Sequence, residues 1–202
     1  MKIKPSERLA LIGTTGSGKS FLAARLLTGL KRAVVIDPKH TFKLEGYKPG
    51  KRLPLWSNEY RLIYRPAMND DSAMAGLLFE LWKRGNVVIY IDELQTLTDL
   101  YPLSTRALEN IARTGREKKI SLWAAMQRPR WVPRIFLTES EVLAVFLLRA
   151  QDDRKYISGF GGPEMESTLP EFGFWYIRPG MVNPIPLKLE GEKFIQLKEV
   201  NA

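Results

Sequence analysis

An eight-residue segment near the N-terminus places the strongest constraint on how this chain can fold. Residues 13–20 have the sequence GTTGSGKS, which fits the phosphate-loop pattern G-x-x-x-x-G-K-[ST] at every fixed position. The apolar run Leu9–Ile12 before it predicts a buried strand, and residues 19–30 after it predict a helix. A strand, a glycine-rich turn and a helix in this order predict a nucleoside triphosphate site on an α/β fold.

Each residue type in this segment has a chemical reason to be there. The glycines let backbone N–H groups turn toward phosphate oxygens, and the following helix presents its positive end to the same anion. Lys19 would reach the β- and γ-phosphates of ATP, and the Ser20 hydroxyl would ligate Mg²⁺. A glycine-rich turn without a ligand is the alternative interpretation. The expected nucleotide-binding residues are Gly13, Thr14, Thr15, Gly16, Ser17, Gly18, Lys19, Ser20 and Phe21.

Composition limits what else the chain can be. With 202 residues and 45% hydrophobic content, we expect a single domain over residues 1–202, built around the phosphate loop. No apolar run is long enough for a membrane span, and the N-terminus lacks a signal peptide, so a soluble, unexported protein is expected. The absence of cysteine and the single histidine exclude thiol chemistry and disfavour a histidine metal site. A net charge of +9 favours a polyanionic partner such as nucleic acid. A soluble protein with a merely basic surface is the alternative interpretation.

Alternating apolar segments and helical patterns extend along the rest of the chain. They favour an α/β fold with a three-layer arrangement, in which a mostly parallel sheet is flanked by helices and has extra C-terminal edge strands. A long basic loop is expected over residues 40–58. The expected strands are Ala33–Ile36, Arg61–Tyr64, Val87–Ile91, Ile120–Met126, Val142–Leu148 and short strands within Phe172–Val200. The expected helices begin at the capping residues Asn69–Asp71, at Ser104 and at Asp152, and the first two end near Arg84 and Lys118.

Two acidic residues follow the buried strand over residues 87–91. Asp92 and Glu93 would lie at its carboxyl end, where open α/β sheets place their ligand sites. Asp92 would hold Mg²⁺ through water, and Glu93 would orient or deprotonate an attacking water. An acidic loop start is the plain alternative, but the phosphate loop upstream favours the catalytic interpretation.

Five tracts, taken in order, resemble the FtsK-HerA superfamily of ring-forming, ATP-driven DNA translocases. They are GTTGSGKS (13–20), IDPK (36–39), VVIYIDE (87–93), IARTGR (111–116) and AMQRP (125–129). The resemblance extends from residue 8 to about residue 160. Without accessory domains or a membrane anchor, the chain looks like the genome-packaging ATPases of icosahedral viruses with an internal membrane.

The resemblance implies roles for further residues. Gln127 would lie at the tip of the strand between the two Walker strands, which are the strand before the phosphate loop (Walker A) and the strand before Asp92 (Walker B), and would sense the γ-phosphate. Arg116 would be an arginine finger acting in a neighbouring subunit's site, with Arg149 as a second candidate and Arg113 as a further one; a solvated helix face is the alternative for the basic cluster around Arg116. The implied partners are double-stranded DNA, a homo-oligomeric ring of five or six subunits, and a capsid vertex or internal membrane protein. The implied location is the cytoplasm of the host cell or the virion.

Two basic tracts are expected to contact DNA. One comprises Arg128, Arg130 and Arg134, and the other comprises Lys43, Lys48, Lys51 and Arg52. Trp131, within the first tract, is expected to anchor its loop against the core, with stacking on bases as the alternative. Two other functions stay open from the sequence: an ATP-dependent phage assembly or secretion factor that moves protein, and a small-molecule kinase. A kinase would leave Glu93 and the tract around Arg116 without a role.

Overall fold

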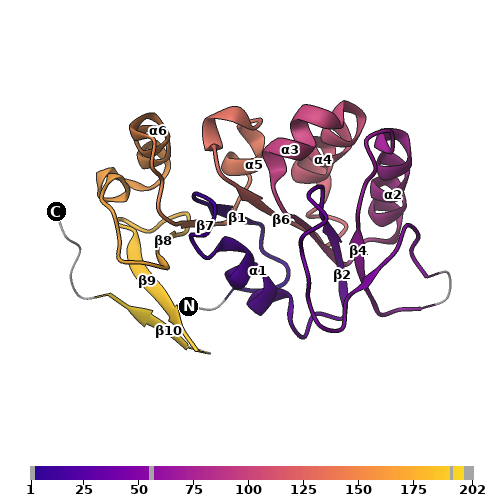
Figure 1. Ribbon diagram of the computed structural model, residues 1–202, viewed down its shortest axis with the longest axis horizontal. Coiled ribbons are helices and arrows are strands. Elements are labelled where there is room, and N and C mark those ends of the chain that lie inside the picture. The colour runs from indigo at the N-terminus through magenta and orange to yellow at the C-terminus, as the bar shows by residue number, and fades with distance from the viewer. Residues whose placement is uncertain (1–2, 55–56, 192, 198–202) are drawn as a thin grey trace.

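The computed structural model describes residues 3–54, 57–191 and 193–197. Ten strands within these residues form one sheet (Figure 1). The strands are β1 (Leu9–Ile12), β2 (Arg32–Ile36), β3 (Lys48–Pro49), β4 (Tyr60–Tyr64), β5 (Val87–Ile91), β6 (Ile120–Met126), β7 (Val142–Val145), β8 (Gly173–Ile177), β9 (Ile185–Glu190) and β10 (Lys193–Gln196). Their spatial order is β10-β9-β8-β7-β1-β6-β5-β2-β4-β3.

Seven of these strands are parallel and three are not. From β7 to β3 every neighbouring pair is parallel, whereas β8, β9 and β10 join the sheet antiparallel. The four residues of β1 are all fully buried, as expected for a central strand that is covered on both faces. The expected parallel sheet with C-terminal edge strands is therefore confirmed, although residues 192 and 198–200 of the expected tail lie outside the described residues.

Helices cover both faces of the sheet. Helices α2 to α6 lie along one face, and α1 lies on the other (Figure 1). Their bounds are α1 (Lys19–Leu27), α2 (Asp71–Arg84), α3 (Leu94–Leu100), α4 (Pro102–Thr114), α5 (Ile135–Thr138) and α6 (Gln151–Gly161), with 3₁₀ turns η1 (Pro129–Trp131) and η2 (Pro163–Glu166).

The alternation of side chains along β1 explains the two cores. Ala10 and Ile12 belong to the large cluster under α2 to α6. Leu9 and Leu11 belong to the second cluster, together with Leu22 of α1. Successive side chains of a strand point to opposite faces, so one short strand contributes to both layers. The predicted three-layer architecture is thus confirmed.

Several expected boundaries were wrong. Helix α1 ends at Leu27 rather than Leu30, because Gly29 adopts a left-handed φ of 88° that a helix cannot continue through. Strand β7 ends at Val145 rather than Leu148. The long loop contains the short strand β3, and helix α3 was not expected, since only seven residues separate Glu93 from Tyr101.

Ser104 does not cap the helix it was expected to begin. Helix α4 already begins at Pro102, where the missing N–H costs nothing, and ends at Thr114 rather than Lys118. The buried Ser104 hydroxyl instead donates to Asp71 Oδ1 over 2.7 Å, which ties α4 to the start of α2. Among the described residues, no helix has both the length and the apolar character that crossing a membrane requires.

Candidate active site

The phosphate loop connects the carboxyl end of β1 to the start of α1. Backbone hydrogen bonds fix its beginning: the Gly13 N–H donates to the Met126 carbonyl over 3.0 Å, and the Thr14 N–H donates to Leu147 over 2.9 Å. A Cβ at Gly13 would lie 2.7 Å from Phe146 Cβ, closer than side-chain carbons can approach. The strands on either side of β1 therefore hold the loop in place, and this close approach accounts for glycine at residue 13.

Lys19 points back into this loop. Its buried ammonium donates to the carbonyl oxygens of Gly13 over 2.7 Å and Thr14 over 2.8 Å. Burial lowers the pKa of Lys19 to about 8, and the nearby carboxylates of Glu93 and Asp92 oppose that shift. A poorly solvated positive charge at the mouth of the loop is suited to pairing with a phosphate group.

Ser20 and Asp92 bring a hydroxyl and a carboxylate together. Ser20 Oγ donates to Asp92 Oδ1 over 3.3 Å, and the Tyr90 hydroxyl donates to the same oxygen over 2.8 Å. Burial raises the pKa of the Asp92 carboxyl, and the neighbouring charges of Asp37 and Glu93 act in the same direction. Two hard oxygen ligands at the edge of a phosphate site form the partial ligand set that Mg²⁺ uses, so these residues fit the expected ion.

Glu93 lies directly beside this pair and is held from two sides. Its Oε2 accepts hydrogen bonds from Lys39 Nζ and from Gln127 Nε2, each over 2.8 Å. Its other oxygen, Oε1, is buried and has no hydrogen-bond partner among the described residues. The Glu93 backbone is left-handed, with φ 75°, which is uncommon for a residue with a side chain. Such strain, together with an unpartnered carboxylate oxygen, is the kind of feature found where a residue does chemistry.

The loop after β2 positions Lys39. The buried Asp37 carboxylate accepts hydrogen bonds from the N–H groups of Thr41 and Phe42 and pairs with Arg65 over 3.2 Å. These contacts fix the turn that carries Lys39 to Glu93. The tract over residues 36–39 is part of the family resemblance, but the sequence indicated no function for Asp37 or Lys39, because pairing with Glu93 depends on β2 and β5 being neighbours.

Gln127 lies where the resemblance implied, at the tip of β6 between β1 and β5. Its backbone N–H donates to Gln95 Oε1 over 2.8 Å, and the Arg128 N–H approaches the same oxygen at 3.4 Å. Gln95 of α3 therefore orients the segment that carries the Gln127 amide. Sequence reasoning missed Gln95, since nothing in the sequence indicated helix α3.

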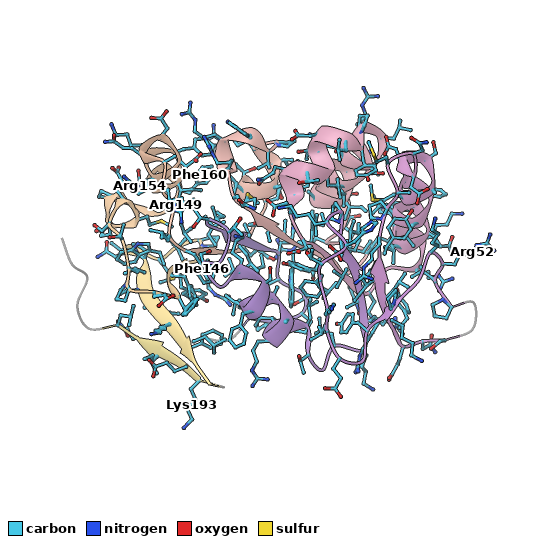
Figure 2. All side chains as sticks on the ribbon, viewed as in Figure 1. Arg52, Phe146, Arg149, Arg154, Phe160 and Lys193 are labelled. Atoms are coloured by element: carbon cyan, nitrogen blue, oxygen red, sulfur yellow. The ribbon has the colours of Figure 1, made fainter. Side chains whose placement is uncertain are left out.

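The arginine-finger candidates lie at different edges of the sheet. Arg116 precedes β6 and Gln127 follows it, so the seven residues of β6, at about 3.3 Å each, place them on the order of 20 Å apart. The Arg116 side chain is 76% exposed, with a loose contact of 3.6 Å to Glu141. Arg149, labelled in Figure 2, is exposed. It lines a cavity of about 330 Å³ together with Thr14, Thr15 and Gln127. Arg113, at the end of α4, pairs with Glu109 over 3.7 Å.

Acidic residues of α6 pair with part of the expected DNA tract. Arg128 pairs with the buried Asp153 over 2.8 Å, and Arg130 pairs with Asp152 over 3.1 Å. Trp131 was expected to anchor its loop against the core, and this was wrong: its side chain is 64% exposed and contacts the Arg128 guanidinium instead. The loop is held by ion pairs, so its tryptophan does not need burial.

The second basic tract has more accessible charge. Lys43, Lys48 and Arg52 are exposed, and Lys51 makes only a long contact of 3.4 Å to Asp70. In Figure 2, Arg52 projects from the end of the molecule opposite to Lys193. This tract therefore lies at the β3 end of the sheet.

Comparisons with known proteins show what this chain is similar to. Residues 5–131 match a family described as AAA domain. The DNA packaging ATPase P9 of Enterobacteria phage PRD1 is 27% identical over 171 residues, which cover 81% of this chain and 74% of that protein.

Solved structures share the fold. The genome packaging NTPase B204 from Sulfolobus turreted icosahedral virus 2, in complex with AMPPCP, superposes with a TM-score of 0.69 at 16% identity, covering 98% of this chain and 100% of that one. The cytoplasmic domain of the Thermomonospora curvata Type VII secretion ATPase EccC gives a TM-score of 0.63 at 14% identity, covering 89% of this chain and 23% of that one. The resemblance to genome-packaging ATPases is confirmed, whereas the fold alone is shared by ATPases with different named roles.

Proposed function

The chain belongs to the AAA domain family, and from this premise we propose that it hydrolyses ATP to move double-stranded DNA during the packaging of a viral genome. The relative from phage PRD1 supports this proposal, since it is named a DNA packaging ATPase and is similar over most of both chains. The observation that supports hydrolysis is the position of Glu93, a buried carboxylate that Lys39 and Gln127 fix beside the phosphate loop. Its second oxygen has no hydrogen-bond partner in the part of the chain that the structure describes.

Glu93 is the general base in this proposal. A water molecule attacks the γ-phosphorus and passes a proton to Glu93 Oε1, while the bond from the γ-phosphorus to the bridging oxygen breaks and ADP leaves with the electron pair. Lys39 and Gln127 hold Oε2 and keep the carboxylate in one orientation. Lys19 neutralises charge on the phosphates, and the N–H groups of residues 13–20 contribute hydrogen bonds.

Ser20 and Asp92 would hold Mg²⁺, which neutralises phosphate charge when bound. Asp92 would act through water, with Tyr90 orienting its carboxylate. Phe21, next to Ser20 in the first turn of α1, would contact the nucleotide beyond the phosphates.

A homo-oligomeric ring of five or six subunits completes the proposed motor. Arg116 lies at the amino ends of the strands, whereas its own phosphate loop lies at their carboxyl ends. This separation supports a role in a neighbouring subunit's site. Arg149 lies near its own loop and is the alternative finger. The ring would act in the host cytoplasm or the virion, docked on a capsid vertex or an internal membrane protein.

A second candidate function is an ATPase that moves protein. The shared fold with the secretion ATPase domain favours it only as far as the nucleotide core. Stimulation of ATP hydrolysis by duplex DNA distinguishes the two functions.

The deciding experiment measures phosphate release from ATP with and without linear duplex DNA at low salt. We expect DNA to raise the rate several-fold, and the Lys19→Ala variant to be inactive in both conditions. Hydrolysis that DNA leaves unchanged would contradict the motor, and would favour the protein-moving alternative.

A further inference from the structure

An apolar cavity of about 410 Å³ opens beside the phosphate loop. Its lining side chains come from three parts of the chain: Phe21 and Leu22 of α1, Phe146 after β7 (Figure 2), and Phe172, Phe174 and Leu189 of the C-terminal segment. The cavity shares Gly18, Phe21 and Phe172 with the pocket that contains Lys19, Ser20, Asp92 and Glu93. A ligand with its phosphates on the loop would therefore have its remainder at the mouth of this cavity.

Two of the aromatic rings are exposed although they border an apolar cavity. Phe21 is 63% exposed and Phe172 is 47% exposed. The Phe172 backbone has a φ of 62°, a left-handed conformation that is costly for an aromatic residue. Exposed apolar rings and a strained backbone are both features that occur at ligand sites.

The aromatic pocket, defined by Phe21, Leu22, Phe146, Phe172, Phe174 and Leu189, contains no polar side chain among the described residues that line it. We propose that this pocket receives the base of the nucleoside triphosphate by stacking, reads no hydrogen-bonding edge of it, and so lets the enzyme hydrolyse purine and pyrimidine triphosphates alike. This inference rests on the proposed nucleotide site and deepens it by naming its substrate class.

The expected selectivity follows from the missing polar groups. A site built to hydrogen-bond a substrate rejects an analogue by about 10⁴- to 10⁵-fold, because its own buried polar groups are left unpaired. A pocket that discriminates by apolar contact alone gives roughly 10- to 200-fold, and every base has an aromatic face to stack. Changes at the base edge should therefore have little effect, with some preference for the larger purines.

The first measurement compares kcat/KM for ATP, GTP and CTP with the intact chain. We expect ATP and GTP to agree within about tenfold, and CTP to fall no more than roughly 100-fold below them. A preference for ATP over GTP beyond roughly 1000-fold would overturn the proposal, since it would require a group that reads the base edge.

The second measurement distinguishes the contribution of the base to binding from that of the phosphates. Phe172→Ala should weaken the binding of ATP, GTP and CTP by a similar factor, roughly 5- to 150-fold, the range seen when a stacked aromatic is removed. Inorganic tripolyphosphate, which has no base, should bind this variant as it binds the parent. Phe172→Tyr keeps the ring and should bind all three nucleotides normally.

Phe79→Ala provides the matched control, because Phe79 is an aromatic of similar exposure (55%) on α2, far from the phosphate loop. It should change neither nucleotide nor tripolyphosphate binding. If Phe172→Ala weakened tripolyphosphate and ATP equally, Phe172 would be supporting the loop and the stacking role would be wrong. If the stacking results are as expected but DNA does not stimulate hydrolysis, the proposed motor function is wrong, whereas the proposed base pocket is supported.

Discussion

The Gln127 side-chain amide donates a hydrogen bond to Glu93 Oε2 over 2.8 Å. The two residues come from the tips of neighbouring strands, β6 and β5, which pair in parallel register. The proposed γ-phosphate sensor and the proposed general base are thus in direct contact. A substitution at either residue would therefore remove or alter a direct contact of the other.

Glu93→Gln should bind ATP and fail to hydrolyse it. The amide keeps the shape of the side chain but cannot accept the proton of water, so we expect kcat to fall by about 10²- to 10⁴-fold. Phosphate release and nucleotide binding should be measured on the same preparation. Glu117→Gln, at an exposed residue before β6, is the matched control and should keep the parent rate. Hydrolysis by Glu93→Gln at the parent rate would show that another group is the base.

Gln95→Leu should lower kcat with little change in KM. The substitution removes the oxygen that accepts the Gln127 N–H, so the sensor amide loses its fixed orientation, and a displacement of about 1 Å can cost roughly 100-fold. Asp99→Asn, at an exposed residue of the same helix, is the control. A rise in KM with unchanged kcat would instead indicate a role in binding ATP.

Mixing two inactive variants tests whether Arg116 acts between subunits. Arg116→Ala and Lys19→Ala each lose one half of a composite site, and a mixed interface can pair an intact arginine with an intact phosphate loop. Partial recovery of hydrolysis is expected in the mixture. If the mixture co-assembles but shows no recovery, Arg116 is not the arginine finger, and Arg149 becomes the candidate.

The affinity for ATP should fall as the pH rises above about 8. Burial lowers the pKa of Lys19 to about 8 in the free protein, so above that pH the side chain is neutral and binding must first take up a proton. The limiting slope is one log unit of Kd per pH unit. Lys19→Arg keeps its charge over this range and should show no such slope, because guanidinium groups remain protonated. A parent protein with constant affinity up to pH 9.5 would contradict the assignment.

Replacing Lys48, Lys51 and Arg52 together by alanine should reduce the salt dependence of DNA binding. Each lost phosphate contact should flatten the slope of log affinity against log salt by about 0.9. The control replaces Lys31, Lys83 and Lys118, which come before β2, β5 and β6 and so lie at the amino ends of the strands. This replacement removes the same amount of positive charge. An equal effect of both triple variants would mean that net charge, not this tract, determines binding.

A matching replacement of Arg128, Arg130 and Arg134 requires a stability measurement beside it. Removing Arg128 leaves the buried Asp153 carboxylate without its ion-pair partner, and an uncompensated buried charge is destabilising by about 3–5 kcal/mol. Loss of DNA binding by this variant counts as evidence for contact only if its thermal unfolding is unchanged.

The sequence alone determined the parts of the site that are continuous along the chain. The phosphate loop, its strand and helix, and the acidic pair after β5 are local patterns, since a turn that cradles phosphate and a strand that ends in carboxylates need particular residues at fixed spacing. The layered sheet followed from the alternation of strands and helices. The family resemblance also placed Gln127 at the tip of the strand between the phosphate-loop strand and the strand before Asp92.

The tertiary structure alone decided which residues meet. Lys39 contacts Glu93, and Gln95 holds Gln127, only because β2, β5 and β6 lie in that spatial order. The pairing of Arg128 with Asp153 and the approach of Phe172 to Gly18 join segments that are distant in sequence. Local patterns cannot encode such contacts, because strand order depends on how the helices pack over the whole sheet, and that packing fixes the neighbours of every strand tip.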